Sequence, residues 1–124
     1  MNKYDGLKFE TYWKDELTSR VIVHNNHVYI KRYVLHPVKQ IFPTNETDVY
    51  TLSKILEGRC WERGRRDIDN ILNKLNIMYY NPLDIVRKTH GVSYNDFIWI
   101  KFEGEKLDWE DIKPRNRREY SNSK

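Results

Sequence analysis

The chain has 124 residues and a net charge of +4, and 39% of its residues are hydrophobic, 14% aromatic and 32% charged. This length suits one domain around one buried core, and the composition excludes a disordered chain. The longest apolar runs are far shorter than a membrane span, and the first residues lack the apolar segment of a signal peptide. Cys60 is the only cysteine, which excludes an internal disulfide and favours a reducing compartment. We therefore expect a cytoplasmic protein that makes no contact with a membrane.

The positive charge is concentrated in two segments of the chain. Residues 58–66 carry four basic residues and one acidic residue, and residues 113–124 carry five and one. The segment between them, 67–112, carries nine acidic and five basic residues. This distribution suits electrostatic steering of an acidic partner, and it equally suits two solvated segments that contact nothing.

The N-terminal part of the chain predicts a short helix and a β-hairpin. Residues 1–19 are weakly patterned, and apolar spacings of three, one and four predict a short amphipathic helix through Phe9, Tyr12, Trp13 and Leu17. Runs of β-branched and aromatic residues at Arg20–His24 and Val28–Leu35 predict two strands. Asn25 and Asn26 lie between these runs and tolerate the positive φ of a tight turn, so we expect the two strands to form a hairpin.

Two helices are predicted in the middle of the chain. The first is Asp48–Glu57, with Thr47 as its N-terminal cap and Gly58 at its end. The second is about Arg65–Asn76, where isoleucine and leucine side chains share one face. The segment that joins these helices has no apolar periodicity, so we expect it to be a connector.

The C-terminal part predicts a third helix, a third strand and a helical turn. Asn81 suits the cap position, Pro82 suits the first helical position, and Gly91 suits the end of this helix. The apolar run Phe97–Phe102 predicts the strand, and Asp108–Ile112 predicts a short capped turn of helix.

Together these elements predict an α+β fold, in which a β-hairpin and a third strand pack against about three short helices. The sequence predicts a single domain over residues 1–112. Residues 113–124 lack apolar periodicity and are predicted to form a basic flexible tail.

The connector Gly58–Arg66, which reads GRCWERGRR, is the strongest candidate for a binding surface. Each arginine offers a forked set of donors to phosphate or carboxylate, and Trp61 can stack on a base or pack at a protein interface. The four arginines are Arg59, Arg63, Arg65 and Arg66. In the structural alternative, the arginines pair with acidic residues such as Asp67 and Asp69, and Trp61 fills the core.

The tail is the second candidate. Its cations are Lys113, Arg115, Arg117 and Arg118. They are suited to a nucleic acid or an acidic protein face, where they add affinity that depends on salt and not on base sequence. The alternative is a solvated tail without a partner.

No group of residues predicts catalysis or a metal site. The spacing of His24, His27, His36 and Cys60 matches no recognised zinc pattern, and we expect histidines that face each other across the hairpin. Asp96 and Trp99 are near other acidic and aromatic residues, but Asp96 has the spacing of a cap and Trp99 that of a core residue. We expect no catalytic residue, no metal and no cofactor.

Three stretches carry a resemblance to a known family: CWERGRRDIDNILNKL, YNPLDIVRKTHGVSYNDFIWI and LDWEDIKPRN. Over Leu52–Asn116 the chain resembles the front module of Firmicutes mobile-element HipA-like proteins, which also occurs as small stand-alone phage or mobile-element proteins. The family's doubled tryptophan and connector proline are missing here, and so are the phosphate loop and catalytic motifs of the kinase body. The resemblance therefore implies an accessory module without kinase activity. Small proteins of this kind include inhibitors of host defence.

These observations lead to a hypothesis of a non-enzymatic binding protein. The connector and the tail would engage an acidic protein or a nucleoprotein complex, as an anti-CRISPR-like inhibitor of host defence would do. The alternative is a sequence-tolerant nucleic-acid-binding protein or transcriptional regulator, whose binding depends on salt. Neither hypothesis specifies an oligomeric state.

Overall fold

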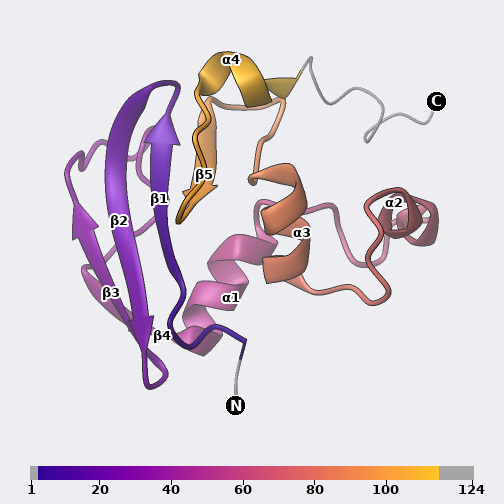
Figure 1. The fold of residues 1–124 in the computed structure, drawn as a ribbon, viewed down its shortest axis with the longest axis horizontal. Coiled ribbons are helices and arrows are strands. Elements are labelled where there is room, and N and C mark those ends of the chain that lie inside the picture. The colour runs from indigo at the N-terminus through magenta and orange to yellow at the C-terminus, as the bar shows by residue number, and fades with distance from the viewer. Residues whose placement is uncertain (1–2, 115–124) are drawn as a thin grey trace.

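A five-stranded antiparallel sheet and four short helices make up the part of the chain that the computed structural model describes, residues 3–114 (Figure 1). The α+β class is therefore confirmed, with five strands where three were expected. The strands lie in the order β4–β3–β2–β1–β5. Their bounds are β1 Lys8–Trp13, β2 Glu16–His24, β3 His27–Arg32, β4 Glu46–Asp48 and β5 Ile98–Phe102.

The predicted N-terminal helix is wrong, because this segment forms β1 and the start of β2. Strand β1 lies inside the sheet and pairs with β2 on one side and β5 on the other. These pairings satisfy the backbone hydrogen-bonding groups of β1 on both sides. Tertiary structure therefore overrides the helical preference that the apolar spacing indicated. The register of β1 and β2 shifts by one residue near Thr11, which leaves Thr18 as an extra residue in β2. This bulge buries both Thr18 and Ser19, whose hydroxyl groups contact the buried hydroxyl of Thr11.

The predicted hairpin is present as β2 and β3. Asn25 and Asn26 have φ angles of 51° and 67°, as a two-residue turn of this kind requires. His24 and His27 pair directly across the turn, as expected from the sequence.

The helices are close to their predicted positions, and their caps explain their ends. They are α1 Val49–Glu57, α2 Ile68–Lys74, α3 Pro82–Thr89 and α4 Trp109–Ile112. Asp48 caps α1 in place of the expected Thr47, because its carboxylate accepts a hydrogen bond from the backbone N–H of Thr51. Asn81 caps α3, as predicted, and Asp108 caps α4. Helix α3 ends at Thr89, and its C-cap residue His90 has a left-handed φ of 61°.

Helices α1, α2 and α3 lie on one side of the sheet (Figure 1). Leucines of α1 and residues of α3 pack with the inward side chains of β1, β2 and β3, and the most deeply buried of these residues are Leu52, Leu56, Leu83, Val86, Val21, Val23 and Val28. Helix α2 lies farther from the sheet and packs around Ile71, Leu72 and Ile85. A third cluster joins Trp99 to Val92 and Ile112 near α4. Within residues 3–114, no helix has both the length and the apolar character needed to cross a membrane.

The long loop between β3 and β4 is anchored by two buried side chains. The amide of Gln40 donates hydrogen bonds to the backbone carbonyls of Thr18 and Val34. Phe42 is 1% exposed and its ring lies 6.4 Å from that of Phe9. The loop therefore contributes a ring to the core, whereas Leu35 in the same loop is 67% exposed.

We predict that Phe42→Ala lowers the free energy of unfolding by about 3–5 kcal/mol, since it opens a cavity in the core. Leu35→Ala is the matched control, because it removes an exposed side chain of the same loop and changes the free energy by less than about 0.5 kcal/mol. Urea unfolding followed by circular dichroism measures both values. Equal losses in the two variants would contradict the placement of Phe42 in the core.

Candidate functional site

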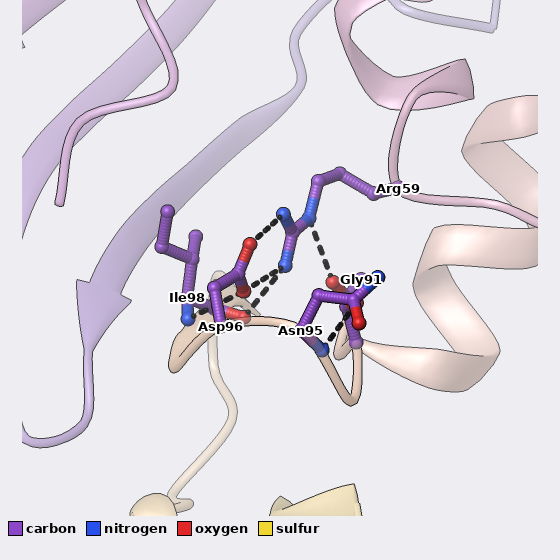
Figure 2. A network of polar contacts seen from close by, with 6 residues as sticks. Arg59, Gly91, Asn95, Asp96 and Ile98 are labelled. Atoms are coloured by element: carbon purple, nitrogen blue, oxygen red, sulfur yellow. Dashed lines mark hydrogen bonds and ion pairs between the residues drawn. The ribbon is translucent and has the colours of Figure 1, made fainter. Parts of the chain in front are cut away.

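Arg59, at the start of the connector, is the centre of a network of polar contacts (Figure 2). Two of its guanidinium nitrogens donate to the two carboxylate oxygens of Asp96, each over 2.8 Å. The same guanidinium donates to the backbone carbonyls of Gly91 over 2.9 Å and Ile98 over 3.0 Å. Its side chain is only 10% exposed. Arg59 therefore joins the connector to the end of α3 and the start of β5.

Gly91 allows this close approach. Its φ is +66°, and a Cβ atom built on it would lie 3.3 Å from Cδ1 of Ile100 and 3.4 Å from Cβ of Arg59. A larger residue would be strained by its backbone and crowded by both neighbours. Gly91, which was expected to end the helix, follows the actual C-cap His90 and makes room for the arginine.

The outer edge of β5 is closed by polar groups instead of a further strand. The backbone N–H of Ile98 donates to Asp96, and the N–H of Ile100 donates to the carbonyl of His90 over 2.8 Å. The N–H of Phe102 donates to Glu105, whose carboxylate also contacts the ring of His90. These contacts satisfy N–H groups that an open edge would offer to another chain.

The pKa of Asp96 is below its ordinary value. Burial by itself raises this pKa, but the hydrogen bonds and the positive charge of Arg59, together with the N–H of Ile98, outweigh burial and lower it. The carboxylate is therefore stabilised in its charged form, as its contacts with the guanidinium require.

The remaining connector arginines lie at the surface. The Arg63 side chain is 59% exposed, stacks 4.2 Å from the ring centroid of Tyr80, and approaches Glu57 at 3.8 Å. The Arg65 side chain is 40% exposed and pairs with Asp67 over 2.5 Å. Arg66 is exposed, and its side chain makes no hydrogen bond or ion pair with residues 3–114.

Trp61, in the middle of the connector, is half-buried. It packs against the cluster around α2, and its carbonyl accepts a hydrogen bond of 2.6 Å from the hydroxyl of Tyr80. Burial, with the nearby thiol of Cys60 and the carboxylate of Glu57, raises the pKa of Tyr80 to about 12, so this hydroxyl keeps the proton that it donates. Trp61 and Tyr80 therefore hold the exposed arginines on a braced segment.

A hollow of about 440 Å³ opens beside the connector. Trp61 and Arg65 line it from the connector, and Ser93, Tyr94 and Asn95 line it from the loop after α3. Tyr94 is 60% exposed. An aromatic pair beside an exposed guanidinium suits a planar or anionic group of a partner.

Cys60 lies in the connector, and its thiol stays protonated. Burial and, to a smaller extent, the carboxylate of Glu57 raise the pKa of its thiol to about 12, and the neighbouring Arg59 and Arg63 only partly oppose this. The thiol donates to the carbonyl of Leu56. It is therefore a packed side chain and not a reactive nucleophile.

Of the four cations predicted to form the tail surface, Lys113 alone lies within the described residues. The amine of Lys113 pairs with Glu110, and its side chain is 14% exposed. Arg115, Arg117 and Arg118 lie outside the described residues. Among residues 3–114, no cluster of three or more histidine, cysteine, aspartate or glutamate side chains is arranged to hold a metal ion.

Sequence reasoning identified the connector but missed the residues that organise it. Asp96 is 37 residues from Arg59, and Tyr80 is 19 residues from Trp61. A structural role for Asp96 was expected, but nothing in the spacing connected it to an arginine. Tyr94, at the hollow, carried no signal apart from being an aromatic residue in a loop.

The fold and this surface define a small antiparallel α+β domain with exposed arginines on a braced connector. No protein-family model matches the chain, and neither a curated protein nor a solved structure shows significant similarity to it.

We predict that Arg59→Ala lowers the free energy of unfolding by about 3–5 kcal/mol, because it leaves Asp96 partly buried without its partner. Arg59→Lys should also destabilise the protein, since an ammonium group lacks the fork that reaches Asp96 and both carbonyls. Arg66→Ala removes an exposed arginine of the same connector, so the expected change is below about 0.5 kcal/mol. Urea unfolding of the three variants measures these differences. A loss of stability confined to Arg66→Ala would refute the assignment of Arg59 as the partner of Asp96.

We also predict that the destabilisation caused by Asp96→Asn depends on pH. The folded pKa of Asp96 is lowered, so its charge stabilises the protein above the unfolded pKa of about 4, and this stabilisation is lost as pH falls through the folded pKa. The difference in free energy of unfolding between wild type and Asp96→Asn should be largest near pH 7 and shrink progressively below about pH 4. Urea titrations at several pH values measure it, and a constant difference would contradict the ion pair.

Proposed function

We propose that the protein is a non-enzymatic binding protein whose connector docks on an acidic surface of a protein or nucleoprotein partner. The observation that carries this proposal is the exposure of three arginines, Arg63, Arg65 and Arg66, within four residues of a braced segment. Arg59 and Tyr80 hold the backbone of this segment in place. A pre-organised segment loses less conformational entropy on binding, and a local excess of positive charge steers an anionic partner.

The carboxylates near these arginines do not argue against this role. Glu57 lies 3.8 Å from Arg63, and Asp67 pairs with Arg65, but all four side chains are at least partly exposed. Ion pairs in such surroundings stabilise a protein little, so a partner's carboxylate can replace them at small cost. Arg66 is available to a partner without breaking any contact within residues 3–114.

The resemblance of the sequence to the HipA-like front module supports a protein of phage or mobile-element type. An inhibitor of a host defence complex, anti-CRISPR-like in its action, would use such a surface to cover an acidic site of its target. We place this action in the cytoplasm, where a lone cysteine such as Cys60 remains reduced.

A nucleic acid is the second candidate partner of the connector. Guanidinium groups bind phosphate as well as carboxylate, and the hollow between Trp61 and Tyr94 offers aromatic side chains beside Arg65. Binding to nucleic acid weakens steeply between about 50 and 200 mM salt, so a salt series on the captured partner separates the two candidates.

We predict that the triple variant Arg63→Ala, Arg65→Ala, Arg66→Ala loses the partner that the wild-type protein retains in a pull-down from bacterial lysate followed by mass spectrometry. Its melting temperature should stay close to that of wild type, because none of these side chains is buried. The control is Lys74→Ala, Lys88→Ala, Lys106→Ala, which removes the same charge at exposed positions outside the connector sequence. Equal capture by both variants would refute the connector as the docking surface, and unfolding of the arginine variant would show that these arginines are structural.

A further inference from the structure

Helices α1 and α3 lie on one side of the sheet (Figure 1), and the face on the other side carries large exposed side chains. Ile22 and Tyr29 are each 47% exposed, and Tyr33, just after β3, is 42% exposed. Ile22 and Tyr29 pair directly across β2 and β3. Helices α1 and α3 pack against the opposite face, so these three side chains remain uncovered within residues 3–114.

The register of the strands aligns cations across this face. Lys101 of β5 pairs with Glu10 of β1, Glu10 pairs with Arg20 of β2, and Arg20 pairs with Lys31 of β3. Four neighbouring strands thus present three cations and one carboxylate in a line, which we call the basic row. Strands lie about 4.8 Å apart, so the row is about 14 Å long.

Tyrosines flank the basic row and contact its cations. The amine of Lys101 lies 4.7 Å from the ring centroid of Tyr12. The guanidinium of Arg20 and the amine of Lys31 lie 5.9 Å and 5.4 Å from the ring centroid of Tyr33. Each cation of the basic row therefore lies beside a tyrosine ring.

The carboxylates on this face do not pair with every cation of the basic row. Glu10 accepts a hydrogen bond of 2.8 Å from Arg20. In the neighbouring row, Glu46 contacts His27 over 3.1 Å and Glu103 contacts Lys8 at 4.0 Å. No carboxylate within residues 3–114 pairs with Lys31 or Lys101, whose closest aromatic contacts are the tyrosines. These two cations at the ends of the row are available to an anionic ligand.

We propose that this face of the sheet binds single-stranded nucleic acid, with phosphates along the basic row and bases stacked on Tyr29 and Tyr33. A sheet surface with exposed tyrosines suits splayed bases, and aligned cations suit the backbone of a single strand. The major groove of a duplex admits a helix or a two-stranded ribbon and not the face of a five-stranded sheet.

Fluorescence anisotropy with labelled 12-nucleotide oligo(dT) and oligo(U) tests this proposal on the full chain. We expect binding at 50 mM salt that weakens with added salt. Tyr29→Ala with Tyr33→Ala should weaken binding at least fivefold, whereas Tyr29→Phe with Tyr33→Phe should retain it, because phenylalanine keeps the stacking surface. Lys31→Ala with Lys101→Ala should reduce the slope of log affinity against log salt by about 1.4, since each phosphate contact contributes about 0.7 on a single strand.

Two controls separate this site from the connector and from loss of folding. The connector variant Arg63→Ala, Arg65→Ala, Arg66→Ala should bind the oligonucleotides as wild type does, and every variant should keep the circular dichroism spectrum of wild type. The proposal is overturned by absence of binding at 50 mM salt. It is equally overturned if the tyrosine and lysine variants bind as tightly as wild type, or if the connector variant alone abolishes binding. Loss of a protein partner in these variants, without oligonucleotide binding by wild type, would assign the face to a protein.

Discussion

The guanidinium of Arg59 joins the connector to two segments that lie far from it in the chain. It holds the connector, the end of α3 and the start of β5 through Asp96 and two backbone carbonyls. Arginine suits this place because its donors lie in one plane with fixed directions, so one side chain satisfies a carboxylate and two carbonyls together. Gly91 provides the space. The contacts also help to close the outer edge of β5, which limits pairing with a further strand.

This arrangement divides the connector into an inner and an outer part. Arg59 and Cys60 face inward, where Arg59 forms an ion pair and Cys60 is a partly buried thiol with a raised pKa. Arg63, Arg65 and Arg66 face outward on a segment that Trp61 and Tyr80 brace. The inner residues give the outer ones a defined position, which makes a binding surface out of what would otherwise be a loose basic loop.

Local physical chemistry explains which predictions from the sequence were confirmed. The turn at Asn25 and Asn26, the cap at Asn81 and the capped turn at Asp108 depend on neighbours a few residues away, and the sequence displays those neighbours directly. Residues 8–17 were different, because their spacing favoured a helix while pairing with β2 and the distant β5 made them strands. The ion pair of Arg59 and Asp96 joins residues that are 37 positions apart, and no spacing of residues in the sequence indicated it.

By itself, the sequence determined the α+β class, the approximate positions of the four helices that form, and the concentration of arginines between two of them, since each rests on short-range patterns. Only the tertiary structure decided which arginine is internal, because burial and partnership depend on Asp96 and Gly91 being brought beside Arg59. It also decided that Lys101, Arg20 and Lys31 stand in one line, since their alignment follows from strand register across segments that are far apart in the chain. Long-range pairing, and not local propensity, therefore set the surfaces through which we propose that this protein acts.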